Sequence, residues 1–262
     1  MNQVDKPSPG SPPPPRGGPV SDLVGGWRAR VGVVVPSVNT VVEPWYGSVC
    51  PPGVTVHTSR MLFEGAFTPE AIVAMDRTEG RDAVRRISTC RPRAIAYGCT
   101  GSSVVQGLKY DLELEREIAQ AAGVPATTAT QAILHAMKEL GVRRIAIASP
   151  YTEKIERAEQ AFFESAGLDV VSCACLGIEG GFELADPTPD RIYQLATKAF
   201  RPDAEAILIP CLNLWSQTVI DRLERDVGVP VVTSTQALLW RLLRIAGIED
   251  RIPGYGRLLS AH

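Results

Sequence analysis

The hydrophobic pattern of the chain occurs twice. Residues 30–37, RVGVVVPS, and residues 144–151, RIAIASPY, are continuous apolar runs broken by a proline, which is typical of strands buried on both faces. A second apolar run follows in each half, AIAY at 94–97 and AILI at 206–209. Each of these shorter runs is followed by a breaker, a cysteine and small polar residues.

A third pair of segments completes the repeat. Residues 123–141 and 228–247 each combine a short strand, a threonine-containing turn and an amphipathic helix that ends in glycine. Three matching segments in the same order indicate an internal duplication. Between them lie segments with helical periodicity, two of which start at Thr68 and Thr188 with the helix-initiating pattern Thr-Pro-acid.

Continuous apolar strands that alternate with helices predict parallel sheets covered on both faces. The sequence therefore predicts an α/β protein of two pseudo-symmetric flavodoxin-like lobes, each a parallel sheet with helices on both faces, with the active site in the cleft between them. We expect a disordered Pro-rich tail at 1–28, a first lobe at 29–125 and a second lobe at 126–235. The C-terminal segment 236–262 is expected to pack back on the first lobe.

Composition and charge limit the expected classes of binding partner. The chain has 262 residues, of which 45% are hydrophobic and 21% charged, and its formal net charge is −2. Without a long basic run, neither nucleic acid nor an anionic membrane is an expected partner, and a small molecule is favoured. No apolar segment has the length of a signal peptide or of a membrane span, so we expect a cytoplasmic protein whose six scattered cysteines are reduced.

The two strand-end cysteines are the strongest chemical signal. Loops at the carboxyl ends of parallel strands form the ligand crevice, so facing lobes would place Cys99 and Cys211 on opposite walls of one cleft. Each precedes a candidate helix, whose N-terminus would lower the pKa of a thiol. One thiol could attack or deprotonate a substrate and the other protonate it, without a metal or organic cofactor. Backbone N–H groups and hydroxyls of Thr100, Gly101 and Ser102 could stabilise the developing carboxylate charge.

A cysteine at the end of a buried strand is often only a small hydrophobe, and two matched cysteines favour the chemical role. The C-x-C pair Cys173 and Cys175 would share one strand face, where packing is favoured over a metal site. His57 follows a strand-like run and His135 lies within an amphipathic helix, so structural roles are expected for both. We therefore expect no metal site.

Four ordered motifs carry a resemblance to a known family. The chain from Arg30 to Gly247 resembles the aspartate/glutamate racemase superfamily, within it the maleate cis-trans isomerase branch, with arylmalonate decarboxylase as a near relative. The motifs are VPSVNTVVEP at 35–44, HTSRM at 57–61, AYGCTGSS at 96–103 and SPYT at 149–152.

The resemblance implies roles for matching residues. Asn39 would hold a substrate carboxylate, Tyr151 would bind the far carboxylate, Cys99 would be the nucleophile and Cys211 the acid. The turns after the cysteines, with Thr100, Gly101 and Ser102 in one and Leu212 and Asn213 in the other, would complete the substrate site. The family works without a cofactor, and the resemblance implies a homodimer or a higher homo-oligomer.

The best hypothesis from the sequence is a cofactor-independent isomerase of a small carboxylic or dicarboxylic acid, with maleate to fumarate as the single best reaction. Gly180 and Gly181 stand where the branch has a substrate-binding Asn, and Trp215 is bulkier than expected, so a substrate with a different second end is an alternative. An amino-acid or hydantoin racemase and an arylmalonate-type decarboxylase are further alternatives. A two-lobed carboxylate-binding protein without catalysis is the alternative from another class.

Overall fold

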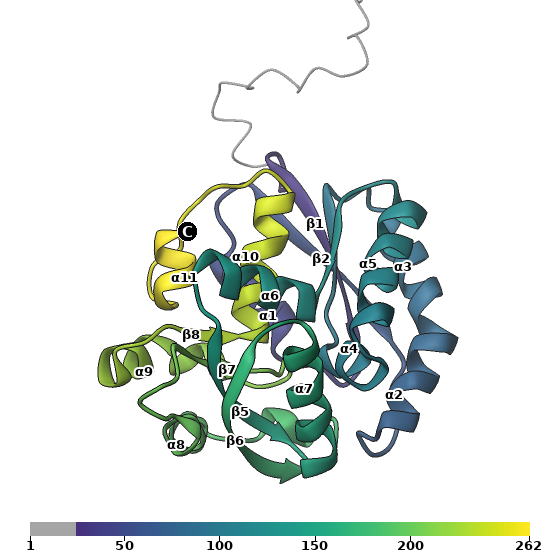
Figure 1. Ribbon diagram of the computed structural model, residues 1–262. Helices are drawn as coiled ribbons and strands as arrows, with labels where there is room; N and C mark the ends of the chain where they lie inside the picture. The colour runs from purple at the N-terminus through teal and green to yellow at the C-terminus, as the bar shows by residue number, and fades with distance from the viewer. Residues whose placement is uncertain (1–24) are drawn as a thin grey trace, which may run out of the picture.

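The structure is a computed structural model that describes residues 25–262 and contains two four-stranded parallel sheets (Figure 1). The strand orders, β2-β1-β3-β4 and β6-β5-β7-β8, are equivalent, and they match the flavodoxin-like order of a doubly wound sheet. This confirms the predicted fold class. The strands are β1 (Ala29–Pro36), β2 (Val54–Met61), β3 (Ala94–Tyr97), β4 (Ala126–Thr128), β5 (Arg144–Tyr151), β6 (Asp169–Ile178), β7 (Ala206–Ile209) and β8 (Val231–Thr233).

Helices cover the sheets, and four of them begin at a threonine whose side chain caps the first turn. The Thr68 and Thr188 hydroxyls accept from the backbone N–H three residues on, and Thr233 forms a capping box with Gln236. The helices are α1 (Val42–Val49), α2 (Pro69–Met75), α3 (Arg81–Ser88), α4 (Thr100–Gln106), α5 (Leu108–Ala122), α6 (Ala129–Glu139), α7 (Glu153–Ser165), α8 (Pro189–Ala199), α9 (Ile220–Val227), α10 (Ser234–Ile245) and α11 (Gly256–Ala261). Short 3₁₀ turns follow at η3 (Glu183–Ala185) and η4 (Ser216–Thr218), and the segment after Thr68 is interrupted by the π-helical turn η2 (Asp76–Gly80).

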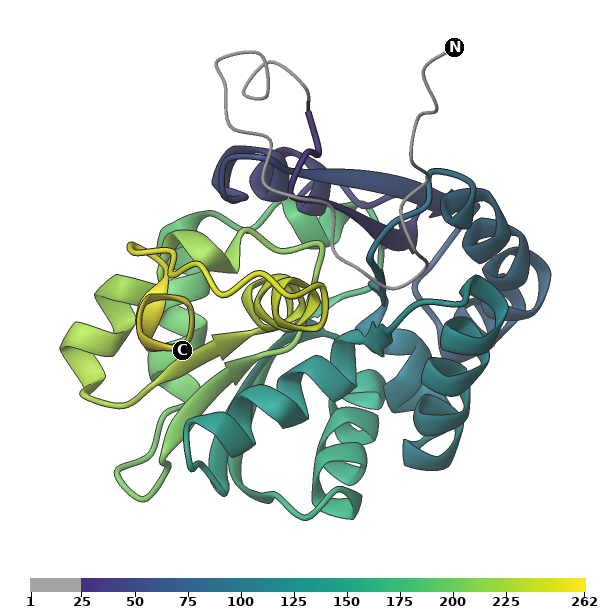
Figure 2. The same cartoon turned by 90° about the horizontal axis from the view of Figure 1, so that it is seen from above.

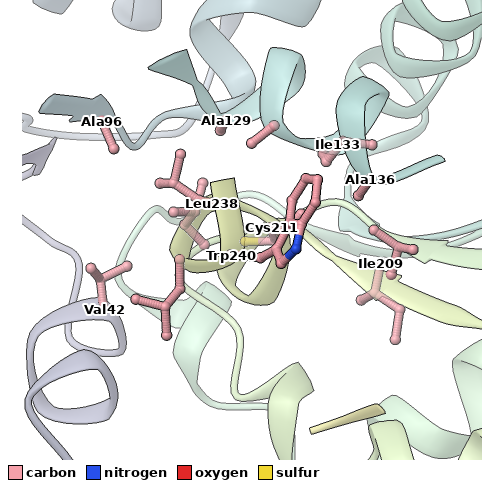
Figure 3. Packing of buried hydrophobic residues seen from close by; sticks show 14 of the residues in the cluster. Val42, Ala96, Ala129, Ile133, Ala136, Ile209, Cys211, Leu238 and Trp240 are labelled. Carbon is pink, nitrogen blue, oxygen red and sulfur yellow. The ribbon is translucent and has the colours of Figure 1, made fainter. Parts of the chain in front are cut away.

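The two lobes meet along the helices that follow their last strands. Helices α6 and α10 pack against each other, and α10 also contacts β3 and β4 of the first sheet as well as β8 of the second. Figure 2 shows α10 between the two sheets. One apolar core spans both lobes and includes Leu238 and Trp240 of α10, Ala96 of β3 and Ile209 of β7 (Figure 3).

The boundaries differ from the expected ones in two places. Strand β4 belongs to the first sheet, so that sheet continues to Thr128, three residues beyond the expected limit of the first lobe. The expected tail lies outside the described residues up to 24, but Arg28 is attached to the fold. Its backbone N–H donates to Gly53 and its guanidinium bonds Asp250 at 2.8 Å. In the C-terminal segment, α10 reaches the first sheet, whereas α11 packs on α9 and β8.

Among the described residues, no helix is both long and apolar enough to cross a membrane.

Candidate active site

The carboxyl ends of β1, β3, β5 and β7 converge on one small cavity. Its volume is about 30 Å³, enough for about two water molecules. The lining comes from both lobes and consists of Pro36, Val38, Asn39, Phe67, Gly98, Cys99, Thr100, Tyr151, Gly181, Leu184, Cys211, Leu212 and Asn213.

Cys99 is the N-cap residue of α4 and is 4% exposed. Its side chain makes no capping hydrogen bond, and the nearby Gly101 and Ser102 lower the pKa of the thiol only in part. Burial raises the pKa of Cys99 to about 12, and the negative charge of Asp76 acts in the same direction. The helix N-terminus predicted from the sequence is present, but desolvation of the thiolate outweighs it.

Cys211 faces the same cavity from the second lobe and is 1% exposed. It does not precede a helix directly, because a turn and η4 separate it from α9, which corrects the expectation from sequence. The Tyr151 hydroxyl and the Asn213 backbone N–H act on the thiol instead, and both lower its pKa. Burial raises the pKa of Cys211 to about 12, so both thiols are protonated near neutral pH.

Tyr151 of the second lobe contacts Phe67 of the first lobe in the cavity lining. Its ring stacks on Phe67 with centroids 5.1 Å apart and planes 10° from parallel, and burial raises the pKa of its hydroxyl. Phe67, which the sequence analysis did not single out, enters the site through the loop before α2. The hydroxyl therefore stays protonated near neutral pH and can act as a donor in the cavity.

Asn39 sits in the turn after β1 and is 3% exposed. Its Oδ1 accepts from the Val41 and Val42 N–H groups at 3.1 and 3.0 Å, which leaves Nδ2 as the end of the amide that can bind a ligand. Arg60, from the HTSRM motif, fixes this turn by donating to the Ser37 and Asn39 carbonyls at 2.7 and 2.9 Å. The motif thus supports the site without lining it.

Asn213 lines the cavity, but its side chain is used to join loops. Its Oδ1 accepts from the Thr40 N–H at 2.9 Å, and its Nδ2 donates to the Gly181 and Val38 carbonyls at 2.9 and 3.3 Å. The side chain is therefore not available to replace the missing Asn as a ligand donor. Gly181 lies in the cavity wall, where an Asn side chain was expected from the resemblance.

Only part of the turn after Cys99 lines the cavity. Thr100 lines the cavity, although its hydroxyl pairs with Ser234 at 2.9 Å. Gly101 lies against Phe67, so close that a Cβ there would be 2.8 Å from the ring, and it contributes only its N–H. Ser102 donates its hydroxyl to Asp76 at 2.8 Å behind the cavity. Leu212 lines the cavity beside Cys211.

The other candidates lie elsewhere. His57 bonds Thr55 at 3.0 Å on β2, His135 is on α6, and Cys173 and Cys175 are on β6, none of them in the cavity lining. Within the described part of the chain, no group of three or more His, Cys, Asp or Glu side chains could hold a metal ion.

Glu159 of α7 is a buried acid that sequence patterning did not reveal, because it lies on the apolar face of its helix. It is 0% exposed, and neither carboxyl oxygen has a hydrogen bond of normal geometry among the described residues. Burial raises its pKa, although the Ser149 hydroxyl opposes the shift.

We predict that Glu159→Gln stabilises the fold at pH 8 and has no effect near pH 4. The raised pKa of the folded state keeps the acid protonated, whereas the unfolded chain gains stability by ionising above its ordinary pKa of about 4.3, so the parent loses stability as pH rises. Thermal unfolding should show a gain of about 2–4 °C for each kcal/mol at pH 8. Glu153→Gln, in the exposed first turn of α7, is the matched control. Equal destabilisation at both pH values would contradict the prediction.

Comparison with known proteins identifies the family. The model of the arylmalonate decarboxylase family matches residues 38–259. Arylmalonate decarboxylase from Bordetella bronchiseptica is 31% identical over 233 residues, covering 86% of this chain and 97% of that protein. A maleate isomerase from Alcaligenes faecalis is 25% identical over 245 residues, covering 88% and 96%. The chain belongs to the arylmalonate decarboxylase family, which confirms the branch predicted from the motifs.

Solved structures agree with this assignment. A liganded arylmalonate decarboxylase, in which a glycine is replaced by cysteine and a cysteine by serine, has a TM-score of 0.82 and 30% identity, covering 89% of this chain and 99% of that one. A Nocardia farcinica maleate cis-trans isomerase carrying a covalent succinylcysteine intermediate has a TM-score of 0.84 at 23% identity, covering 89% and 98%, and shows the shared fold. Because the relatives are enzymes, we conclude that this chain is an enzyme.

Proposed function

We propose that this protein is a cofactor-independent isomerase of a small carboxylic acid that acts through Cys99 and Cys211. The observation that carries the proposal is the position of the two thiols, which stand at equivalent strand ends of a duplicated fold and line one cavity. Tyr151 and the free amide end of Asn39 line the same cavity and supply donors for a carboxylate. Two acid-base groups facing one substrate suit a reaction in which a proton or a nucleophile is added and later removed.

With maleate as substrate, the Cys99 thiolate would add to one carbon of the double bond while Cys211 gives its proton to the other. The product is a succinyl thioether whose central C–C bond can rotate. Return of the proton to Cys211 and departure of the Cys99 thiolate then release fumarate. The succinylcysteine reported for the Nocardia farcinica relative supports this scheme by analogy.

A second candidate is suggested by the cavity wall. The lining residues, all in the described part of the chain, include no Lys, Arg or His, whereas Val38, Phe67, Leu184 and Leu212 are apolar. Gly181 supplies no side-chain donor. This lining suits an acid with one carboxylate at the Tyr151 end and an apolar group at the other, and the 31% identity to arylmalonate decarboxylase favours the same class. With such a substrate the thiols would exchange an α-proton or protonate the carbanion left by decarboxylation.

The test is proton NMR of the purified protein in deuterated buffer with maleate, maleamate, aspartate, glutamate, hydantoins and substituted malonates. We expect conversion of maleate to fumarate. Deuterium entering an α-position or loss of CO2 would establish the second candidate, and it would replace the maleate assignment. If no compound of the panel reacts at any pH between 6 and 9, the proposed isomerase function is wrong.

A further inference from the structure

The side chain of Asn213 binds the backbone on both sides of Asn39, the proposed carboxylate ligand. Asn213 follows Cys211 by two residues in the second lobe and is 6% exposed. Its Oδ1 accepts from the Thr40 N–H at 2.9 Å, and its Nδ2 donates to the Val38 carbonyl at 3.3 Å. The side-chain amide thus pairs with the first lobe in the way that a residue of a parallel strand would.

A third hydrogen bond uses the rest of this amide. Asn213 Nδ2 also donates to the Gly181 carbonyl at 2.9 Å, in a loop whose Glu179 carbonyl accepts from the Phe67 N–H of the first lobe at 2.7 Å. The network fixes which way the amide points, because the reversed amide would place its oxygen against two carbonyl oxygens. The Asn213 amide therefore stands where the loops after β1, β6 and β7 meet at the cavity.

The turn that carries Asn39 is also held from within its own lobe. Arg60 donates to the Ser37 and Asn39 carbonyls at 2.7 and 2.9 Å. These two bonds shape the turn, but they do not connect it to the second lobe. Asn213 makes that connection, and its own place beside Cys211 is fixed by packing, since the leucines on either side of it are at most 3% exposed.

We propose that Asn213 is a positioning residue that fixes the Asn39 turn against the Cys211 wall and so sets where the substrate carboxylate lies between the two thiols. The inference rests on the proposed function, in which Asn39 binds a carboxylate and Cys211 transfers a proton. These two groups belong to different lobes, and a displacement of about 1 Å between a bound substrate and a catalytic group can cost roughly 100-fold in rate. Arg60 alone keeps the turn folded without setting its distance from Cys211.

Asn213→Ala removes the three bonds of the amide and keeps those of Arg60. We expect kcat to fall roughly 100-fold with KM within about threefold of the parent value, because the Asn39 amide still binds the carboxylate while the bound substrate is out of line with Cys211. Steady-state kinetics with the substrate that the panel identifies measures both constants. A rise in KM alone, or an unchanged kcat, would overturn the proposal.

Asn213→Asp gives a readout that a loss of stability would not move. The new carboxyl still accepts from the Thr40 N–H, but when ionised it faces the Val38 and Gly181 carbonyls with no hydrogen to donate. Burial and these two oxygens raise its pKa above the ordinary value of about 3.9, so at low pH it is protonated and donates again. Its kcat relative to the parent should rise roughly tenfold from pH 8 to pH 5, whereas the ratio for Asn213→Ala should stay constant. A flat ratio in both variants would contradict the proposal.

Hydrogen exchange of the Thr40 amide, followed by NMR, needs no substrate. Thr40 is an exposed residue, so the protection of its N–H depends on the bond to Asn213. In Asn213→Ala the exchange should be at least roughly tenfold faster. Thr218→Val is the matched control, since it removes a side-chain bond to the Trp215 carbonyl at 2.6 Å in the same connection, outside the cavity lining, and should alter neither exchange nor turnover.

The two measurements separate this inference from the proposed function. Faster Thr40 exchange in Asn213→Ala with an unreactive panel would reject the proposed function and keep Asn213 as the residue that fixes the Asn39 turn. Exchange at the parent rate would overturn the assignment whether or not the panel reacts. If Asn213→Ala does not fold, Asn213→Asp at pH 5 and pH 8 decides the question, with circular dichroism as the check of folding at both pH values.

Discussion

Cys99→Ala and Cys211→Ala are each expected to lower turnover by roughly 1,000-fold or more, because each removes a group that forms or breaks a bond to the substrate. The two thiols act on one substrate, so the double variant should be no slower than the slower single one. The measurement is the NMR assay with the substrate found in the panel. Both cysteines are buried, so thermal unfolding of each variant checks that lost activity is not lost structure.

The matched control is Cys173→Ala, which removes a partly buried strand cysteine outside the cavity lining and should leave turnover unchanged. Unequal losses would be informative. If Cys99→Ala keeps the parent rate while Cys211→Ala is inactive, one thiol suffices, and the two-thiol mechanism is wrong in favour of single-cysteine protonation. If both variants keep the parent rate, Cys99 and Cys211 are core residues.

The fold was predictable because its signals are local. Continuous apolar runs such as 30–36 and 144–150 form the central strands β1 and β5, and the same order of segments in both halves predicts two equivalent sheets. The expected lobe boundary fell before the short strand β4, although the repeat makes this strand the counterpart of β8, the last strand of the second sheet. The membership of β4 depends on its pairing with β3.

The sequence predicted which strand ends come together to form the site. The rule that loops gather at the carboxyl ends of parallel strands brings Asn39, Cys99, Tyr151 and Cys211 to one cavity. The rule does not give side-chain partners. Asn213 looked like a free donor in the sequence but is bound to three backbone groups of other loops.

The acids behind the cavity could not be predicted. Asp76 lies in a segment whose periodicity indicates an ordinary helix, and its hydrogen bond with Ser102 depends on tertiary packing. The pKa of the thiols was also misjudged. The sequence indicates the helix N-terminus that lowers the pKa of Cys99, but the burial that raises it to about 12 depends on tertiary packing. The homo-oligomer and the cytoplasmic location stay predictions.

Tyr151→Phe is expected to lower kcat roughly 100-fold, about the loss caused by removing one donor from an oxyanion site. The hydroxyl lowers the pKa of Cys211 and is the donor proposed for a substrate carboxylate, so its removal should raise the pKa of Cys211 further and leave developing charge unpaired. The phenylalanine ring can keep the stacking contact with Phe67, so the fold should change little. Steady-state kinetics and alkylation of Cys211 measure the two effects separately.

The control for this variant is Tyr193→Phe, which removes a hydroxyl bonded to Asp226 at 2.7 Å outside the cavity and should not affect turnover. The split between kcat and KM then assigns the role of the Tyr151 hydroxyl. A loss confined to KM, with Cys211 alkylated at the parent rate, would make it a binding group for the ground-state carboxylate and would contradict its role at Cys211. A loss in kcat with slower alkylation of Cys211 is the expected result, because one hydroxyl cannot be removed without weakening the thiolate that it stabilises.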